Sequence, residues 1–400
     1  MKEIDFLLTN PTATPSDVSL LSATTTNSQK STRYRSITPY TINYPAGSTI
    51  IFRSGDSPFT YNPGISFTPQ DVVNYFNDQF DIGDVSLFAN NAIDGTVYEL
   101  ISPNTFVQIE INLSVFWFSQ VSGTAQNLLS TYFIDAVTGW ACGNSGTILK
   151  TINGGTTWTP QVSGTVQTLT SIFFTDANNG WACATGGVIL NTSNGGTTWN
   201  PQVSGVGTNL LAIFSTDANN GWVCGSGGVI RNTTNGGATW SPQVSGVGTV
   251  LQAIYFIDAN NGWMAGFNGV VINTTNGGTT WNPQVSGVGA LALYSISFIN
   301  SNEGWICGLN GSIIHTINAG ATWSTQVSGI VITVLYSIFF ISALIGWACG
   351  NGGAIINTVD GGLTWNNQSF STLQDLRSIK MINQSLGYSC GTGGIIIKYS

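Results

Sequence analysis

A ladder of tryptophans with a fixed period constrains the fold of this chain more than any other feature. Gly-Trp pairs recur 41 or 42 residues apart, and a second tryptophan follows each pair. The first ladder comprises Trp140, Trp181, Trp222, Trp263, Trp305 and Trp347, with Tyr388 in the seventh place, and the second comprises Trp117, Trp158, Trp199, Trp240, Trp281, Trp323 and Trp365. Such a period, built from short apolar runs and glycine-rich turns, is typical of a β-propeller with one four-stranded sheet per repeat.

Each repeat is predicted to contain four short strands separated by tight turns. In one repeat the strands are expected at 171–175, 181–184, 188–192 and 197–203, with turns at 176–180, 185–187 and 194–196. The Asn-Gly and Gly-Gly pairs in these turns reach the positive φ values that tight hairpins need. We expect the tryptophans to pack between blades, where a large flat side chain buries the most area.

The two ends of the repeat array are expected to pair. Residues 107–117 alternate apolar and polar side chains, which is strand periodicity, and Trp117 takes the place of a fourth-strand tryptophan. The chain ends at the third-strand position of the seventh repeat. An N-terminal strand therefore closes the ring and removes its exposed edges. The sequence predicts an all-β fold, a seven-bladed β-propeller over residues 106–400.

Two smaller parts are predicted before the repeats. Residues 1–36 are rich in Thr, Ser, Asn and Pro and read as an extended arm, either a flexible tail or a tether that orders on a partner. Residues 37–105 are predicted to form a small α/β module for docking or assembly. Its helix would start at Thr68, followed by a proline and then by an apolar face that ends at Phe80. Its strands are expected at 38–44, 48–53, 85–89 and 96–101.

The charge of the chain excludes several kinds of partner. Only 7% of residues are charged, the net charge is -8, and only five basic residues follow residue 110. Nucleic acid and anionic membranes both need clustered Lys and Arg, so we expect neither as a partner. The N-terminus lacks the apolar core of a secretory signal. Residues 330–347 are long enough to span a membrane, but they align with an inner strand of the neighbouring repeat, so no membrane insertion is expected.

The turn TSNGGTTW and its counterparts resemble the Asp-box of bacterial neuraminidase repeats, which closes the hairpin between the third and fourth strands. Where that family has aspartate, this chain carries Asn153, Asn194, Asn235, Asn276, Asn318 and Asp360. The longer pattern GWACGNSGTILKTINGGTTW resembles the repeat of the photosystem II stability and assembly factors, which are seven-bladed propellers. The resemblance covers residues 106–400. It implies the fold and a structural role for the box, whereas fold does not fix function.

The two resemblances imply different activities. Sialidases, similar in the box, hold the substrate carboxylate with an arginine triad, but the predicted propeller contains only Arg231 and Arg377. A glycosidase would also need two converging carboxylates. The photosystem factors hold a partner with a basic patch, and cations are sparse here. We therefore expect no enzyme, no catalytic residue and no cofactor.

Two repeated side chains are candidates for a metal or redox site. One cysteine per blade, two residues after the Gly-Trp aromatic, is either a reactive thiol or a small buried apolar side chain, and we expect the second. The cysteines are Cys142, Cys183, Cys224, Cys307, Cys349 and Cys390, with Ala265 in the remaining blade. One aspartate ends the inner strand in four repeats, at Asp135, Asp176, Asp217 and Asp258. Calcium needs several converging oxygens, so an Asx-turn is the expected role and no metal site is predicted.

Two further positions depart from the repeat. His315 is the only histidine and fills a polar position of the third strand without a catalytic partner in motif spacing. Phe267 and Leu309 are larger than their counterparts in the turn between the second and third strands, and Asn268 and Asn310 follow them. These four residues are the candidate ligand-binding residues, since an exposed aromatic beside an amide suits stacking on a sugar or peptide. The alternative is local packing between blades.

Three functions follow from these observations. The leading hypothesis is a non-enzymatic bacteriophage virion surface protein, a fibre, decoration protein or adhesin. Residues 1–105 would contact other virion or surface proteins, and the propeller a glycan or surface protein. Such a protein would be virion-bound or extracellular without a classical signal peptide. The alternative is a cytoplasmic assembly factor that binds a membrane-protein client. The third hypothesis is a glycosidase.

Overall fold

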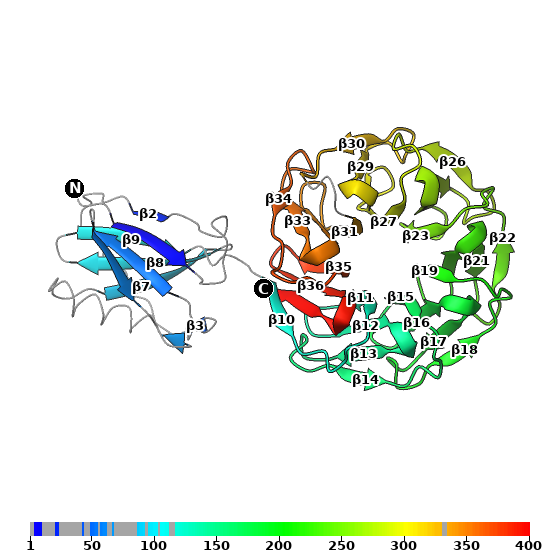
Figure 1. Ribbon diagram of the computed structural model, residues 1–400, viewed down its shortest axis with the longest axis horizontal. Helices are drawn as coiled ribbons and strands as arrows, with labels where there is room; N and C mark the ends of the chain where they lie inside the picture. Colours follow the sequence, from blue (N-terminus) through cyan, green and yellow to red (C-terminus); the bar gives the residue numbers. More distant parts are fainter. Residues whose placement is uncertain are drawn as a thin grey trace. The chain divides into compact units, whose positions relative to one another are not determined.

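Figure 1 shows a computed structural model of the chain. It describes residues 117–329 and 334–400, and before residue 117 only the backbones of nine short strands. The chain divides into two compact units, residues 1–115 and 116–400.

The strands of the first unit pair in three antiparallel sheets, ordered β2-β1-β4-β5, β3-β6 and β7-β8-β9. Their bounds are β1 Ile4–Thr9, β2 Leu21–Ala23, β3 Ile42–Asn43, β4 Thr49–Ser54, β5 Ser57–Tyr61, β6 Ser66–Phe67, β7 Ser86–Ala92, β8 Gly95–Ser102 and β9 Thr105–Ile111. Strand β1, from the segment predicted as an arm, pairs with β4. The helix expected from Thr68 to Phe80 lies outside the described residues, so the arm and the α/β module stay predictions.

The second unit is a seven-bladed β-propeller, as predicted, and each blade is an antiparallel four-stranded sheet. The inner strands are β11 Leu128–Phe133, β15 Leu169–Phe174, β19 Leu210–Ser215, β23 Leu251–Phe256, β27 Leu293–Phe298, β31 Leu335–Phe340 and β35 Leu376–Asn383. The second strands are β12 Gly139–Gly143, β16 Gly180–Ala184, β20 Gly221–Gly225, β24 Gly262–Gly266, β28 Gly304–Gly308, β32 Gly346–Gly350 and β36 Leu386–Gly391.

The outer half of each blade contains the third and fourth strands. The third strands are β13 Ile148–Thr151, β17 Ile189–Thr192, β21 Ile230–Thr233, β25 Val270–Thr274, β29 Ile313–Thr316, β33 Ile355–Thr358 and β37 Ile396–Tyr399. The fourth strands are β14 Thr159–Gln161, β18 Asn200–Gln202, β22 Ser241–Gln243, β26 Asn282–Val285, β30 Ser324–Gln326, β34 Asn366–Asn367 and β10 Trp117–Gln120. A 3₁₀ turn joins the second strand to the third: η2 Asn144–Gly146, η3 Thr185–Gly187, η4 Ser226–Gly228, η5 Phe267–Gly269, η6 Leu309–Gly311, η7 Asn351–Gly353 and η8 Thr392–Gly394.

The ring is closed by β10, which pairs with β37 and places Trp117 opposite Tyr399. The Gln120 side chain then connects the seventh blade to the first: it donates to the Gly154 carbonyl at 3.2 Å and accepts from the Trp158 indole N–H at 3.2 Å. This confirms closure by an N-terminal strand. The strand predicted over 107–117 is too long, because Thr105–Ile111 pairs with β8 in the first unit and the propeller strand starts at Trp117.

Aromatic rings fill the space between blades, as predicted. The Trp140 ring on β12 stacks on Phe174 of the next blade with centroids 3.5 Å apart, and Phe174 meets Trp199 edge-on at 5.9 Å. Phe133 and Tyr388 form the equivalent stack at the closing interface, at 3.6 Å. Because these rings are buried, each blade contributes half of the apolar core that its neighbour completes.

The turns lie on two opposite faces. The backbone N–H of Gly195, in the Asp-box turn, donates to Asn178 in the first-to-second strand turn of the same blade. The Thr185 N–H of η3 donates to Thr168 in the loop that precedes the inner strand. We call the first surface the Asp-box face and the second, formed by the 3₁₀ turns and the loops between blades, the loop face.

The apolar segment 330–347 contributes β31 and the start of β32 to the propeller, as predicted, and residues 330–333 lie outside the described residues. Within the described part of the chain, no helix is both long and apolar enough to cross a membrane.

Candidate binding site on the loop face

The Asp-box side chains bond within their own turns. Asn153 Oδ1 accepts from the Thr151 hydroxyl and the Thr157 N–H, both at 3.0 Å, and its amide donates to the Thr157 hydroxyl at 2.9 Å. The turns of Asn194, Asn235, Asn276 and Asn318 repeat this pattern. At Asp360 the hydroxyl of Thr364 donates instead, because a carboxylate only accepts.

The repeated aspartates cap turns of the Asp-box face. Asp176 Oδ1 accepts from the backbone N–H groups of Asn178 and Asn179 at 2.7 and 2.9 Å, and Asp135, Asp217 and Asp258 do the same in their blades. Hydrogen bonding, first from the Asn179 side chain, lowers the pKa of Asp176 below its usual value. The Asx-turn prediction is confirmed. Among residues 117–329 and 334–400, no group of three or more His, Cys, Asp or Glu is placed to hold a metal.

The six cysteines have free thiols and are fully buried, which confirms the expected packing role. The Cys142 thiol donates to the Leu169 carbonyl at 3.7 Å. Burial raises the thiol pKa at every one of these positions, to about 12 at Cys183 and Cys349. Since the thiolate is the reactive form, these side chains are inert in the folded protein.

His315 belongs to a closed pair of side chains. Its ring stacks on Trp305 with centroids 4.5 Å apart, and its Nε2 lies 3.3 Å from Glu303 Oε1. Burial lowers the pKa of His315, and the Glu303 contact opposes that shift. The arrangement links the second and third strands of one blade, where Trp305 and His315 are paired across the sheet.

The four candidate ligand residues lie on the loop face, in the 3₁₀ turns of two neighbouring blades. Asn268 and Asn310 are exposed and both adopt φ of 59°, a left-handed conformation that asparagine tolerates better than most residues. This left-handed backbone conformation thus accounts for the choice of asparagine at both positions. Phe267 contacts Tyr294 of the next blade: the two rings meet edge-on with centroids 6.0 Å apart.

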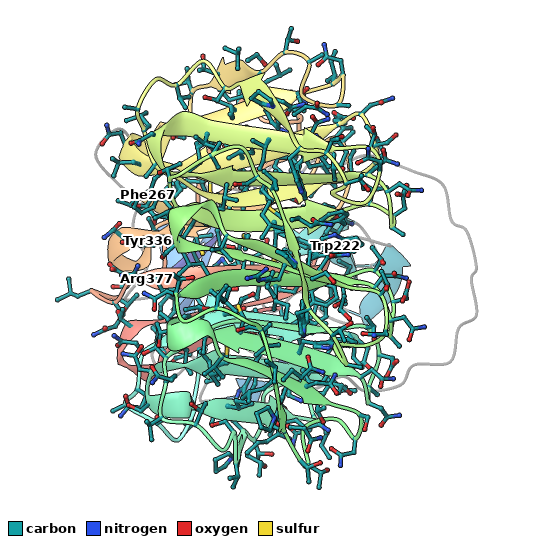
Figure 2. All side chains as sticks on the ribbon, turned by 90° about the vertical axis from the view of Figure 1, so that its right-hand side faces the viewer. Trp222, Phe267, Tyr336 and Arg377 are labelled. Atoms are coloured by element: carbon teal, nitrogen blue, oxygen red, sulfur yellow. The ribbon has the colours of Figure 1, made fainter. Side chains whose placement is uncertain are left out.

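Tyr294 extends the Phe267 contact into a continuous row of side chains. Its ring meets Tyr336 of the next blade at 5.6 Å, and the Arg377 guanidinium of the seventh blade lies 3.8 Å from the Tyr336 ring centroid. We call Phe267, Tyr294, Tyr336 and Arg377 the aromatic rim. All four side chains are half-buried, and Figure 2 shows three of them, Phe267, Tyr336 and Arg377, along one edge of the propeller.

The charge of the rim is small. Arg377 Nη2 forms an ion pair with Asp375 Oδ2 at 2.9 Å, so the charge of the single cation in the rim is neutralised by a neighbouring carboxylate. Burial raises the pKa of Tyr294, with a smaller contribution from Tyr336, so the phenol stays protonated near neutral pH. The rim can therefore stack on planar groups and donate hydrogen bonds, but it is not a basic patch.

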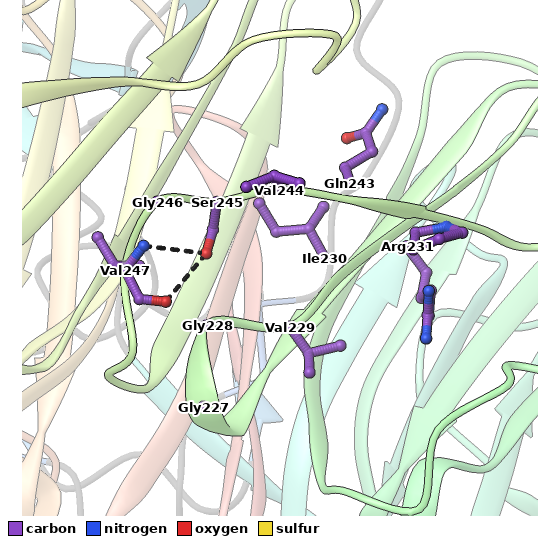
Figure 3. A pocket seen from close by; sticks show the side chains of 11 residues that line it. Gly227, Gly228, Val229, Ile230, Arg231, Gln243, Val244, Ser245, Gly246 and Val247 are labelled. Atoms are coloured by element: carbon purple, nitrogen blue, oxygen red, sulfur yellow. Dashed lines mark hydrogen bonds between the residues drawn. The ribbon is translucent and has the colours of Figure 1, made fainter.

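A separate surface hollow of about 410 Å³ lies beside Arg231, between β21 and the strand-to-loop segment Pro242–Val247 (Figure 3). Its walls are mostly glycine and valine. The Ser245 hydroxyl bonds the backbone of Val247, and Arg231 donates to the Gly205 carbonyl at 3.3 Å. Ser245 and one nitrogen of Arg231 are thus engaged with the backbone, whereas Arg231 Nε has no hydrogen-bond partner within the described part of the chain. None of the residues that line the hollow is aromatic, so the rim is the better candidate site for a planar ligand.

The aromatic rim can be traced in the sequence only by comparing one register position across the repeats. The second residue of each inner strand is Leu129, Thr170, Leu211, Gln252, Tyr294, Tyr336 and Arg377 in blade order. Three consecutive blades therefore carry an aromatic or cationic side chain at this position, after Leu, Thr, Leu and Gln in the other four. The candidate ligand residues predicted from the sequence all lie at turn tips and do not include this strand position.

A known family accounts for the repeat. The family described as photosynthesis system II assembly factor YCF48 matches residues 109–200, 161–245 and 243–332. The chain belongs to this family. The resemblance noted in the repeat sequence is thereby confirmed, and the description of the family names an assembly factor and no catalytic activity.

Solved structures share the propeller. The structure titled "YCF48 bound to D1 peptide" is 20% identical with a TM-score of 0.61, and the match covers 71% of this chain and 94% of that chain. YCF48 from Cyanidioschyzon merolae is 20% identical with a TM-score of 0.60, covering 71% and 98%. Virginiamycin B lyase from Staphylococcus aureus is 12% identical with a TM-score of 0.62, covering 71% and 99%. At these identities the likeness shows the fold alone. No curated protein sequence matches the chain.

Proposed function

We propose that the chain is a non-enzymatic client-binding propeller of the assembly-factor type, and that a segment of a membrane-protein client binds along the aromatic rim. The continuous row from Phe267 through Tyr294 and Tyr336 to Arg377 carries the proposal. Family membership supports it, as does the relative whose title names a bound D1 peptide.

The rim favours an extended segment with planar or aromatic groups. Half-buried aromatic rings in a row can bind such groups by stacking on their accessible faces, and each buried aromatic contact contributes roughly 0.5–1.5 kcal/mol beyond its area. Because Arg377 is already paired with Asp375, binding should depend weakly on salt. This departs from the basic patch that the family resemblance implied.

The assembly-factor hypothesis, which was the alternative on sequence alone, is therefore preferred to the hypothesis of a phage virion protein. None of the similarities reported above is to a virion protein, and the contacts proposed for residues 1–105 remain a prediction. A client-binding role beside a membrane fits the cytoplasmic alternative. The chain shares its fold with a lyase, but that likeness extends to the fold alone and does not make an enzyme of it.

Calorimetric titration with the D1 peptide tests the proposal. We expect saturable binding by the full chain, at least about tenfold weaker in Tyr336→Ala, since a lost stacking anchor of about 1.4 kcal/mol is a tenfold loss. Leu363→Ala is the matched control, because Leu363 is 82% exposed in an Asp-box turn of the opposite face. If both variants weaken binding equally, or if neither weakens it, the client binds at a site other than the rim.

A photo-reactive phenylalanine analogue at position 267 identifies the natural partner. With membrane extract, we expect a cross-link to a membrane protein that the same analogue at position 363 does not form. A cross-link to polysaccharide alone would instead favour the glycan-binding hypothesis over the client-binding one.

A further inference from the structure

The fifth residue of each inner strand belongs to a ring that encircles the propeller axis. In blade order these residues are Tyr132, Phe173, Phe214, Tyr255, Ser297, Phe339 and Lys380, and we call them the collar. Four neighbours touch in sequence, with ring centroids 4.6, 4.7 and 5.2 Å apart from Tyr132 to Tyr255. All collar residues except Ser297 are half-buried, so each of them keeps part of its side chain exposed to solvent.

Lys380 is the single charged residue of the collar. Its ammonium lies 4.7 Å from the Tyr132 ring centroid and 4.3 Å from that of Phe339, so an aromatic ring of each neighbouring blade flanks it. Neither of the two ion pairs in the described residues includes Lys380. An ammonium partly withdrawn from water without an anion is unfavourable, and contacts with two aromatic faces offset only part of that cost.

Hydrogen-bond donors accompany the cation. Burial raises the pKa of Tyr132 to about 12, with a smaller contribution from Tyr255, and burial also raises the pKa of Tyr255 above its usual value. Both phenols therefore stay protonated. Phe173, Phe214 and Phe339 supply apolar walls and carry no charge. The collar thus combines one cation, two O–H donors and aromatic walls, and lacks an anion.

We infer that the collar is a binding site for a single carboxylate attached to an apolar or aromatic body, with Lys380 as its counter-ion. The carboxylate supplies the missing negative charge, and the body contacts the phenylalanine rings. A free small acid and the C-terminus of a peptide share this chemistry. The inference goes beyond the proposed client site, since the collar residues lie three positions further along each inner strand than the rim.

Titration of the full chain with benzoate at pH 7 tests the inference. We expect one saturable site per chain, with affinity at least tenfold weaker in Lys380→Met, which keeps the side-chain length and removes the charge. Lys150→Met is the matched control, because Lys150 donates to the Gly195 carbonyl at the edge of a blade, outside the collar. Circular dichroism establishes that both variants are folded.

Proton uptake gives a readout that a purely structural lysine would not produce. Burial lowers the pKa of Lys380 to about 8, so near pH 8 the free site is half protonated. A bound carboxylate raises that pKa, and calorimetry in buffers of different ionisation enthalpy should show uptake of about half a proton per benzoate. Above that pH, affinity should fall as the amine loses its charge.

The dipeptide Gly-Phe and its amide distinguish the two sources. Binding of the free dipeptide but not the amide supports a peptide C-terminus, and binding of benzoate alone supports a free acid. If neither benzoate nor Gly-Phe binds, or if Lys380→Met leaves binding unchanged, the inference is overturned. Peptide binding at the rim would persist in either case, so the client-binding proposal is judged separately.

Discussion

The Trp222 indole on β20 stacks on Phe256 of the next blade with ring centroids 3.8 Å apart and planes 15° from parallel. Its N–H also donates to the Gly277 carbonyl, in the Asp-box turn of that same neighbour, at 3.1 Å. A single side chain thus joins two blades by both a stack and a hydrogen bond. Figure 2 labels Trp222 within the propeller, away from the rim.

Trp222→Ala is expected to destabilise the propeller by about 3–5 kcal/mol, because it removes a buried aromatic and leaves a cavity between two blades. Denaturant titration followed by circular dichroism measures the loss. Val203→Ala serves as the control, since Val203 is 86% exposed and its truncation should change stability by less than about 0.5 kcal/mol. Equal effects of the two substitutions would contradict the interblade role.

Gly187→Ala should be far more damaging than Gly207→Ala, although both glycines border the same loop between blades. Gly187 has φ of +76°, and a Cβ there would lie 1.9 Å from the Val206 carbonyl oxygen. Gly207 has open space around it. We expect Gly187→Ala to lower the melting temperature by several degrees and Gly207→Ala to leave it nearly unchanged. A similar melting temperature for both variants would show that the turn adapts.

The sequence predicts the propeller well because its determinants are local and repeated. The blade count, the closing strand and the packing of Trp140 against the next blade all follow from the period and the turn residues. The interblade hydrogen bonds of Gln120 do not, because its amide meets the Gly154 carbonyl and the Trp158 N–H through a geometry that only the closed ring creates.

The rim and the collar could not be predicted, for a different physical reason. Their members lie about one blade apart in sequence and meet only in the ring. A register shift between Leu169 and Ser171, repeated in the other blades, also interrupts strand alternation where the rim residues lie. Tyr294, Tyr336 and Lys380 become noticeable only when equivalent positions are compared across all seven blades.

Asp360 should give the propeller a pH dependence that its asparagine counterparts cannot. Hydrogen bonding, first from the Thr364 hydroxyl, lowers its pKa from 3.8 to about 2. Because the folded pKa is depressed, the stabilisation is present above about pH 4 and is lost as the pH falls toward 2. Melting of Asp360→Asn and the parent should therefore converge on acidification. The variant should keep its turn, since five blades carry asparagine there. A constant difference between the two across this range would exclude the effect.

Ser215 marks an interblade position where the aromatic stack is missing. Phe174 and Phe256 occupy the equivalent position in the flanking blades, whereas Ser215 is buried there. The Ser215 hydroxyl has no hydrogen-bond partner among the described residues, and neither does the indole N–H of Trp181 on the neighbouring blade. Burying such groups unpaired costs about 1–3 kcal/mol each.

Ser215→Phe should therefore stabilise the propeller, by about 0.5–2 kcal/mol, the usual range for filling an under-packed site. The new ring would stack on Trp181 as Phe174 stacks on Trp140, and Gly221, which faces position 215 as Gly180 faces Phe174, leaves room for it. Denaturant titration of Ser215→Phe and Ser215→Ala separates the two contributions, because alanine removes the unpaired hydroxyl without adding a ring. If alanine stabilises and phenylalanine destabilises, the neighbouring side chains already fill the space, and the missing stack is compensated by local repacking.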